Sequence, residues 1–222
     1  MVIIFLGPPG VGKGTQAKLL AGKFGIPHVS AGEILRSAVS SGSTRGKKAD
    51  EYLQRGDLVP DDIMVEVVGE ELTGPMYSNG FILDGFPRTI AQAEALDLLF
   101  QRLKISIDAV LSLEADEKEL IRRLSRRRMC RNCGSIFNLD LDEVSDPAVC
   151  PRCGGELYQR DDDKEETIRN RFRVYILVTD MLRDYYSRKG LLIPIHGVGE
   201  IRTIFEEIVT RLSRQNAKAE GK

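Results

Sequence analysis

The chain has 222 residues, of which 42% are hydrophobic, so it is long enough for one large domain or for a core with insertions. Its 32 basic and 33 acidic residues leave a net charge of −1, which excludes a global attraction to nucleic acid or to an anionic membrane. The apolar start lacks a basic flank and a cleavage-type sequence, and no later segment is apolar over enough residues to span a bilayer, so we expect a cytoplasmic protein.

The first fifteen residues, MVIIFLGPPGVGKGT, predict a strand, a glycine-rich loop and a helix in direct succession. The apolar run Val2–Leu6 is typical of a strand buried on both faces. Glycines at positions 7, 10, 12 and 14 let backbone N–H groups curl around an anion, and the helix predicted over 15–24 points its N-terminus at the loop. Together with Lys13, these features predict a phosphate-binding loop.

The loop departs from the general pattern G-x-x-x-x-G-K-[ST], because Gly14 follows the lysine and the hydroxyl falls on Thr15. The form G-x-P-G-x-G-K-G-T resembles the adenylate kinases, a branch of the nucleoside monophosphate kinases. A glycine-rich turn without a ligand is the alternative, which the ordered succession of strand, loop, lysine and helix disfavours.

The next segment resembles the family's acceptor arm. A short strand is predicted over Ile26–Val29, and Ser30 with Glu33 forms a capping box that opens a helix to about residue 41. The sequence SAGEILR at 30–36 is similar to the arm that holds the acceptor monophosphate in this family, which implies a phosphate contact for Arg36. Ala31 replaces the family's threonine and is associated with the kinases that accept UMP or CMP.

A short helix over 47–54 and the return GDLVP at 56–60 complete this region. In the resemblance Val59 belongs to the wall around the acceptor base, and Asp57 stands where many members carry lysine. An ordinary helical hairpin is the alternative for the whole region.

A second signature, DGFPRT, occupies 84–89, after a helix predicted over 61–73 and a strand predicted over Phe81–Leu83. Asp84 at the carboxyl end of a strand is placed to hold magnesium through water, and Arg88 can fork onto a phosphate. DGFPR resembles the family's second motif, and Gln92 matches the glutamine that reads adenine, which favours AMP as acceptor. A surface glutamine at the start of a helix is the alternative for Gln92 alone.

An arginine-rich stretch follows a helix over Ala91–Leu103 and a strand over Ala109–Leu113. We expect a helix over 117–129, on which Arg123 and Arg127 share one face and lean over a nucleotide. They align with the family's arginines for phosphate and for stacking on the donor adenine. A solvated basic face or a nucleic-acid patch is the alternative.

Four cysteines follow the spacing C-x2-C-x16-C-x2-C. This spacing predicts a zinc site, and four thiolates leave no position for water, so the zinc is expected to be structural. The ligands are Cys130, Cys133, Cys150 and Cys153. The segment resembles the zinc-bearing long lid of many bacterial adenylate kinases, which implies that Ile136 and Phe137 flank the donor nucleotide. A zinc ribbon that binds nucleic acid is the alternative.

The remaining chain predicts a helix capped by Asp163 and Glu166 that ends near residue 188, a strand over Leu191–Ile195, a helix over Glu200–Leu212 and a polar tail over 215–222. Arg160 and Arg171 match the family arginines that grip the phosphates between donor and acceptor. Neither His28 nor His196 belongs to a catalytic pattern.

Alternating strands and helices imply an α/β fold, a five-stranded parallel sheet with helices on both faces. We expect a core from 1–29, 60–125 and 164–222, a monophosphate-binding first insert at 30–59 and a zinc-binding second insert, or lid, at 126–163. The resemblance implies that a monomer transfers the terminal phosphoryl group of Mg-ATP to AMP, giving two ADP. A kinase for UMP or CMP and a nucleotide-driven switch with a nucleic-acid-binding zinc ribbon are the alternatives.

Three sets of site residues follow from the resemblance. The catalytic set is Lys13, Arg88, Arg123, Arg160 and Arg171. The ATP set is Gly10, Val11, Gly12, Lys13, Gly14, Thr15, Arg127, Ile136, Phe137 and Gly199. The AMP set is Ala31, Arg36, Asp57, Leu58, Val59, Gly85, Phe86, Pro87, Arg88, Gln92, Arg160 and Arg171.

Overall fold

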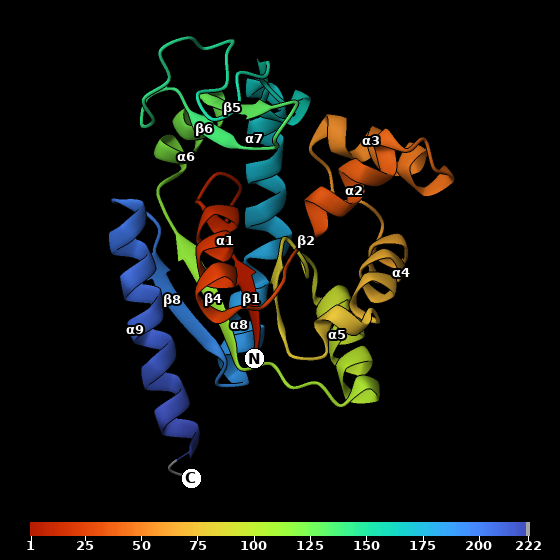
Figure 1. The fold of residues 1–222 in the computed structure, drawn as a ribbon. Coiled ribbons are helices and arrows are strands. Elements are labelled where there is room, and N and C mark those ends of the chain that lie inside the picture. The colour runs from red at the N-terminus through yellow and green to blue at the C-terminus, as the bar shows by residue number, and fades with distance from the viewer. Residues whose placement is uncertain (221–222) are drawn as a thin grey trace.

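A parallel five-stranded sheet forms the centre of the molecule (Figure 1). The computed structural model describes residues 1–220, without the side chains of 44, 45 and 216–220. The strands are β1 (Val2–Leu6), β2 (His28–Ser30), β3 (Phe81–Asp84), β4 (Ala109–Glu114) and β8 (Leu192–His196), in the order β2-β3-β1-β4-β8. Every neighbouring pair is parallel, which confirms the predicted fold class.

The side chains of β1 show why the sheet is covered on both faces. Successive residues of a strand point to opposite faces, and all five residues of β1 are buried. Ile3 and Phe5 pack against α1 (Lys13–Phe24) and α9 (Ile201–Glu220). Val2, Ile4 and Leu6 belong to the cluster on the other face, built with α4 (Asp61–Leu72), α5 (Ile90–Leu103) and α8 (Met181–Arg188). A uniformly apolar strand therefore holds two helical layers together.

The first insert is a hairpin of α2 (Ala31–Ser40) and α3 (Thr44–Arg55). The hydroxyl of Ser30 accepts a hydrogen bond from the backbone N–H of Glu33 at 3.4 Å, as the capping pattern predicts. Gly46 allows the two helices to approach closely, because a Cβ there would lie 2.0 Å from the carbonyl oxygen of Ala38. The chain returns to the core at α4, and a single 3₁₀ turn, Pro75–Tyr77, follows that helix.

The second insert contains a small antiparallel sheet that the sequence did not predict. Its strands are β5 (Arg127–Cys130), β6 (Ile136–Asn138) and β7 (Leu157–Tyr158), in the order β6-β5-β7. The predicted helix over 117–129 is wrong at its end, because α6 spans only Glu117–Ser125. Arg127 pairs with Asn138 and Met129 with Ile136, so pairing between distant segments overrides the local helical preference.

The C-terminal third also differs from the expectation at two points. One helix was expected to end near residue 188, but α7 (Glu165–Val174) passes through a π-helical segment, Tyr175–Thr179, before α8 begins. The last helix was expected to end at Leu212, but α9 continues to Glu220 through the predicted polar tail, where Gln215 donates a hydrogen bond to the carbonyl of Asp108 at 3.3 Å. Residues 221–222 of that tail lie outside the described part.

Both inserts lie at the end of the molecule where the strands of the central sheet terminate (Figure 1). This is the edge at which parallel sheets gather their ligand-binding loops. Across residues 1–220, every helix is too short or too polar to cross a membrane.

Candidate active site

The loop between β1 and α1 has the shape of an anion cradle. Gly10 and Gly12 have φ values of 83° and 100°, which a side chain would rarely adopt. A Cβ on Gly10 would also lie 2.7 Å from Cγ of Leu124. No described side chain caps the N-terminus of α1, so its first backbone N–H groups face the loop. The ammonium group of Lys13 donates to the carbonyls of Gly7 at 2.8 Å and Pro8 at 2.9 Å and so lies across the loop.

Lys13 and Asp84 are oppositely charged side chains beside this loop. Desolvation, to which neighbouring arginines add, lowers the pKa of Lys13 to about 8. Burial alone would raise the pKa of Asp84, but the nearby His28 and the charge of Lys13 hold it below its usual value. The Nε2 atom of His28 lies 3.6 Å from Oδ2 of Asp84.

The carboxylate of Asp84 can serve a hard metal ion at this place. Its Oδ2 would lie 3.4 Å from a Cβ built on Gly14, so it is directly below the phosphate loop. An ionised carboxylate is the ligand type that magnesium prefers beside substrate phosphates. The residues present therefore fit a magnesium ion that is bound with a nucleotide.

A second group of polar side chains follows β3. The guanidinium Nε of Arg88 donates to the carbonyl of Gly85 at 2.9 Å, which fixes the side chain close to its own turn. Burial lowers the pKa of Arg88. Gln92 is only 1% exposed, so the interpretation as a surface glutamine is wrong. Its amide donates to Asp61 and accepts from the backbone of Arg88, both at 2.7 Å.

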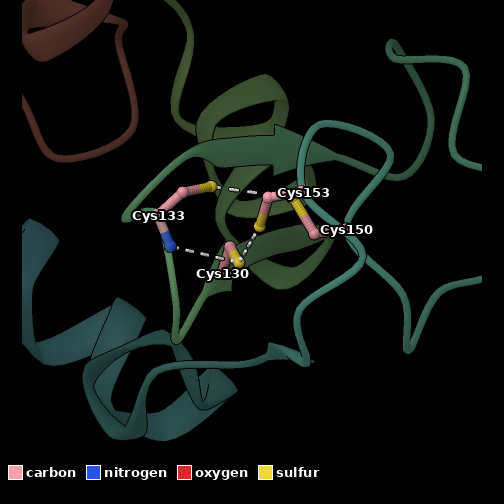
Figure 2. Close-up of side chains that lie close together, drawn as sticks. All are labelled: Cys130, Cys133, Cys150 and Cys153. Atoms are coloured by element: carbon pink, nitrogen blue, oxygen red, sulfur yellow. Dashed lines mark hydrogen bonds between the residues drawn. The ribbon is translucent and has the colours of Figure 1, made fainter.

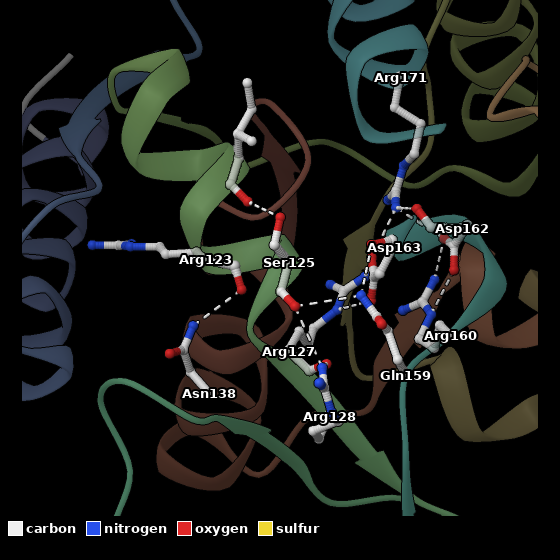
Figure 3. A network of polar contacts seen from close by, with 11 residues as sticks. Arg123, Ser125, Arg127, Arg128, Asn138, Gln159, Arg160, Asp162, Asp163 and Arg171 are labelled. Carbon is white, nitrogen blue, oxygen red and sulfur yellow. Dashed lines mark hydrogen bonds and ion pairs between the residues drawn. The ribbon is translucent and has the colours of Figure 1, made fainter. Parts of the chain in front are cut away.

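The arginines of the second insert and of α7 are held by two neighbouring aspartates (Figure 3). Arg160 donates to Asp162 at 2.8 Å, and Arg171 contacts the same carboxylate at 2.9 Å. Arg127 binds Asp163 through two hydrogen bonds of 2.7 and 2.6 Å. The guanidinium groups of Arg160 and Arg171 hold the pKa of Asp162 well below its usual range, against the effect of burial.

Two sequence-based interpretations of this region are wrong. Asp163 does not begin a helix as a cap; it lies in the 3₁₀ turn Asp161–Asp163, and α7 starts at Glu165. Arg123 and Arg127 do not share a helix face, because Arg127 belongs to β5. The side chain of Arg123 instead donates to Glu119 at 2.7 Å and to the carbonyl of Gly197 at 3.1 Å.

The residues expected around the acceptor converge on one pocket. Apart from the buried Phe86 and from Pro87, all of them line it. The shared lining consists of Ala31, Arg36, Asp57, Leu58, Val59, Gly85, Arg88, Gln92, Arg160 and Arg171. Burial, with the charge of Arg160, lowers the pKa of Arg36 to about 10. Arg36, Arg88, Arg160 and Arg171 outnumber the two aspartates of the lining, Asp57 and Asp162, so the pocket carries an excess of positive charge at neutral pH.

A second pocket adjoins the first and joins it to the phosphate loop. It is lined by Lys13 and Pro9 of the loop, and it shares Gly85, Arg88 and Arg171 with the first pocket. Pro87 also lies on this side. Two anions bound in the two pockets would meet between Lys13 and the shared arginines, where positive charge offsets their mutual repulsion.

The other residues expected around the donor are distributed over three elements. Ile136 and Phe137 belong to β6 of the second insert. Gly199 follows β8 and has a φ of 133°. Arg123 connects α6 to the turn that contains Gly197.

The four cysteines lie together in the second insert (Figure 2). Their Sγ atoms all lie within 4.8 Å of one another, with 3.5 Å between Cys130 and Cys153 and 3.8 Å between Cys133 and Cys150. Four sulfur atoms around zinc at about 2.3 Å would be about 3.8 Å apart, so the donor set fits a tetrahedral zinc ion.

The surroundings of the cysteines also fit a metal that orders the segment. Gly134 and Gly154 have φ values of 66° and 71° just behind each pair, which closes the two turns. A hydrogen bond with Ser135 lowers the pKa of Cys133, whereas burial raises the pKa of Cys150 to about 11. A cation at the centre would favour the thiolate form of every ligand.

Asp61, Asp162 and Asn170 contact the site, and sequence reasoning gave none of them a role there. Asn170 donates to Asp57 at 2.7 Å and to the carbonyl of Arg55 at 2.8 Å, which ties the first insert to α7. The partners of Asp61 and Asn170 lie far apart from them in the chain, so no spacing could have indicated those contacts, whereas Asp162 is only two residues from Arg160.

Comparison with known proteins gives a consistent result. A family model described as adenylate kinase matches residues 5–191. The adenylate kinase of Archaeoglobus fulgidus is 50% identical over 214 residues, which cover 96% of this chain and 99% of the relative. That of Methanothrix thermoacetophila is 50% identical over 214 residues with the same coverage. That of Thermodesulfovibrio yellowstonii is 47% identical over 215 residues, which cover 97% and 100% of the two chains.

Proposed function

The chain belongs to the adenylate kinase family, and from this membership we propose that it transfers the terminal phosphoryl group of Mg-ATP to AMP, reversibly, to give two ADP. The observation that carries the proposal is the pair of adjoining pockets that share Gly85, Arg88 and Arg171. One pocket reaches the phosphate loop at Lys13, and the other is lined by Arg36 and Gln92. This arrangement fits two nucleotides whose phosphates meet end to end.

The transfer needs no general base. An oxygen of the AMP phosphate, already an anion at neutral pH, attacks the terminal phosphorus of ATP. The bond from that phosphorus to the bridging oxygen breaks, and ADP leaves with the electron pair. Lys13 binds the donor phosphates, and Arg88, Arg123, Arg160 and Arg171 neutralise charge on the transferring group. Asp84 would hold magnesium through water, and the ion would supply further charge neutralisation.

The proposed domains follow the predicted boundaries. The core comprises 1–29, 60–125 and 164–222, and the inserts at 30–59 and 126–163 fold over the nucleotides before transfer. Exclusion of water prevents the loss of ATP to hydrolysis. In this arrangement the first insert contributes Arg36 and the second contributes Arg127 and Arg160. The four cysteines would hold a zinc ion, which would order the second insert and take no part in the chemistry.

The remaining residues bind the nucleotides. ATP contacts Gly10, Val11, Gly12, Gly14 and Thr15 in the loop, then Arg127, Ile136, Phe137 and Gly199. AMP contacts Ala31, Asp57, Leu58, Val59, Gly85, Phe86, Pro87 and Gln92. Membership of the adenylate kinase family and the place of Gln92 in the wall of the acceptor pocket support AMP over a pyrimidine acceptor.

We also propose a cytoplasmic monomer that does not bind nucleic acid. The net charge of −1 supports the absence of nucleic-acid binding, as do the ion pairs within the basic run at 122–131. Arg122 and Arg126 each lie 2.7 Å from Asp140, so this face carries little unpaired positive charge. Chromatographic mass at micromolar concentration tests the monomer, and a filter-binding assay with RNA tests the absence of nucleic-acid binding.

One assay tests the reaction. The protein is mixed with Mg-ATP and, in turn, AMP, UMP, CMP and GMP, and the formation of nucleoside diphosphate is followed. We expect ADP from AMP at the highest kcat/KM. ATP hydrolysis without transfer would instead indicate a nucleotide-driven switch. Arg88→Ala should lower kcat by about 10²-fold or more, whereas Arg102→Ala on the exposed side of α5 should not change it.

A further inference from the structure

Gln92 lines the acceptor pocket, and each end of its side-chain amide makes a hydrogen bond within the protein. It stands in the first turn of α5 and is 1% exposed. Its Nε2 donates to Oδ1 of Asp61 at 2.7 Å, and its Oε1 accepts from the backbone N–H of Arg88 at 2.7 Å. Asp61 belongs to α4, which packs against α5, and Arg88 lies just before α5 in the chain.

These two partners permit only one orientation of the amide. A carboxylate accepts hydrogen bonds, and a backbone N–H only donates them. A Gln92 amide rotated by 180° would place its carbonyl against the carboxylate and its NH₂ group against the N–H of Arg88. Two hydrogen bonds would be lost and like dipoles would face each other, so the rotated amide is strongly disfavoured.

Asp61 is itself fixed in place. Its Oδ2 accepts a hydrogen bond from the hydroxyl of Thr89 at 2.9 Å. The same hydroxyl accepts the backbone N–H of Gln92 at 3.1 Å and thereby caps α5. Asp61 also lies in the first turn of α4, where a helix terminus stabilises a negative charge. Among the described residues, Gln92 lines the acceptor pocket and Asp61 does not, so Asp61 acts through Gln92.

The oriented amide retains one N–H and one acceptor lone pair for a ligand, since each end has used half of its capacity. A purine with an amino group at C6 presents a donor at that group and an acceptor at N1. A purine with an oxo group at C6 presents the reverse, an acceptor at O6 and a donor at N1. If both bases occupy the same position, only the edge of the 6-aminopurine complements the Gln92 amide in its fixed orientation.

We propose that Asp61 is a specificity-determining positioning residue, which holds the Gln92 amide in the orientation that accepts a 6-aminopurine monophosphate and rejects a 6-oxopurine monophosphate. This inference rests on the proposed function, because it takes the pocket lined by Gln92 as the site of the acceptor base. It goes further by assigning the choice between two purines of equal size to a carboxylate outside the pocket wall.

AMP and IMP are the matched probes, because their bases differ only at the edge in question. The test measures kcat/KM for both acceptors with saturating Mg-ATP, for the wild-type protein and for Asp61→Ala. Without Asp61, the rotated amide loses one hydrogen bond instead of two. The AMP to IMP ratio of kcat/KM should therefore fall by about tenfold, with a higher KM for AMP and a KM for ATP within about twofold of the wild type.

Two further variants separate orientation from folding. Asp62→Ala removes the same charge from the same helix turn at an exposed position and should leave the ratio unchanged. Asp61→Asn keeps the shape and an acceptor oxygen, so its ratio should lie between those of the wild type and Asp61→Ala, about threefold below the wild type. If Asp61→Ala does not fold, Asp61→Asn decides the question, and an unchanged ratio there overturns the proposal.

The outcomes are distinct. A fall in the AMP to IMP ratio with Asp61→Ala, and no fall with Asp62→Ala, supports the role of Asp61. An equal loss for both acceptors, with the ratio within twofold of the wild type, overturns it and shows a merely structural residue. A wild-type protein that phosphorylates neither nucleotide would overturn the proposed function itself.

Discussion

The two inserts lie at the same end of the central sheet, but they are stabilised by different means. The first insert is a helical hairpin that contributes Leu35, Ala49 and Val59 to the main hydrophobic core. The second insert has a separate small cluster, in which two of the three buried residues, Cys130 and Cys150, are metal-ligand candidates and the third is Leu157.

The difference shows two solutions to one requirement. In the proposed reaction, each insert would present arginines to a phosphate and would have to move. A helical pair can use the core of the molecule as its support, whereas a segment of short strands and turns has too little apolar surface of its own and requires a metal and ion pairs. We therefore expect the two inserts to respond differently to the same perturbations.

The largest effect should come from removal of zinc. Chelation, or the double variant Cys150→Ser and Cys153→Ser, should disorder the second insert and lower the Tm by about 10 °C or more, because a structural zinc ion contributes several kcal/mol of folding free energy. Calorimetry measures the Tm, and hydrogen exchange should show lost protection in β5 to β7 but not in α2 and α3. At a temperature where the chelated protein is still folded, its kcat should be affected less than its thermal stability. Equal loss of activity and stability at low temperature would contradict a purely structural metal.

The next effect compares one arginine from each insert. Arg160→Ala in the second insert should lower kcat by about 10²- to 10³-fold if, as proposed, its guanidinium group stabilises charge that develops during transfer. Arg36→Ala in the first insert should raise the KM for AMP by about tenfold with a smaller change in kcat, because it binds the acceptor phosphate equally before and during transfer. Steady-state kinetics separate the two cases. Arg126→Ala, which removes a surface partner of Asp140, is the control.

The core contributes the positive charge of Lys13 to the site, and the protonation of this amine depends on pH. The pKa of Lys13 in the nucleotide-free protein is about 8, so kcat/KM for ATP should fall as the pH rises above 8, by up to tenfold per unit. The phosphates of a bound nucleotide should raise the pKa of Lys13. Because kcat reports the nucleotide-bound protein, it should persist to a higher pH than kcat/KM does. Lys13→Arg should abolish the inflection near pH 8. A profile that stays flat to pH 10 would contradict the assignment.

The same shift affects stability with a defined sign. The folded pKa of Lys13 lies below its ordinary value of 10.5, so the unfolded chain binds more protons between pH 8 and 10.5. The cost of burying the charged amine is fully present below pH 8. It decreases as the pH rises through that interval, which denaturant titrations of the nucleotide-free protein can measure against Lys13→Met.

The smallest effect should come from a helix cap in the first insert. The hydroxyl of Ser43 accepts the backbone N–H of Gly46 at 3.0 Å and begins α3. Ser43→Ala should cost about 1 kcal/mol and lower the Tm by about 2–4 °C, without the chelator sensitivity of the second insert. The exposed Ser40→Ala is the control. A loss as large as that caused by zinc removal would abolish the distinction between the inserts.

Much of the fold could be predicted because its signals are local. The buried strand, the glycine loop and the helix at the start of the chain are contiguous, and the cysteine pairs show their spacing directly. The errors occur where distant segments meet. Arg127 belongs to a strand because Asn138 pairs with it, and Asp163 is buried against Arg127 and does not cap a helix.

The candidate site shows the same division. Residue types such as Lys13, Arg88 and Gln92 could be selected from motifs, but their partners could not. Gln92 and Asp61 are 31 positions apart, and Asn170 and Asp57 are 113 apart. Hydrogen bonds across such separations leave no periodicity in the sequence.

The class of fold, the phosphate loop, the group of four cysteines and the family could be predicted from the sequence alone, because each depends on a short stretch whose chemistry is complete in itself. Three features required the folded structure: which carboxylate holds which arginine, that the pocket lined by Arg36 and Gln92 adjoins the pocket that reaches Lys13, and that Asp61 accepts a hydrogen bond from the Gln92 amide. These features depend on groups brought within about 3 Å by packing of the core, and the direction and distance of a hydrogen bond exist only once that packing is made.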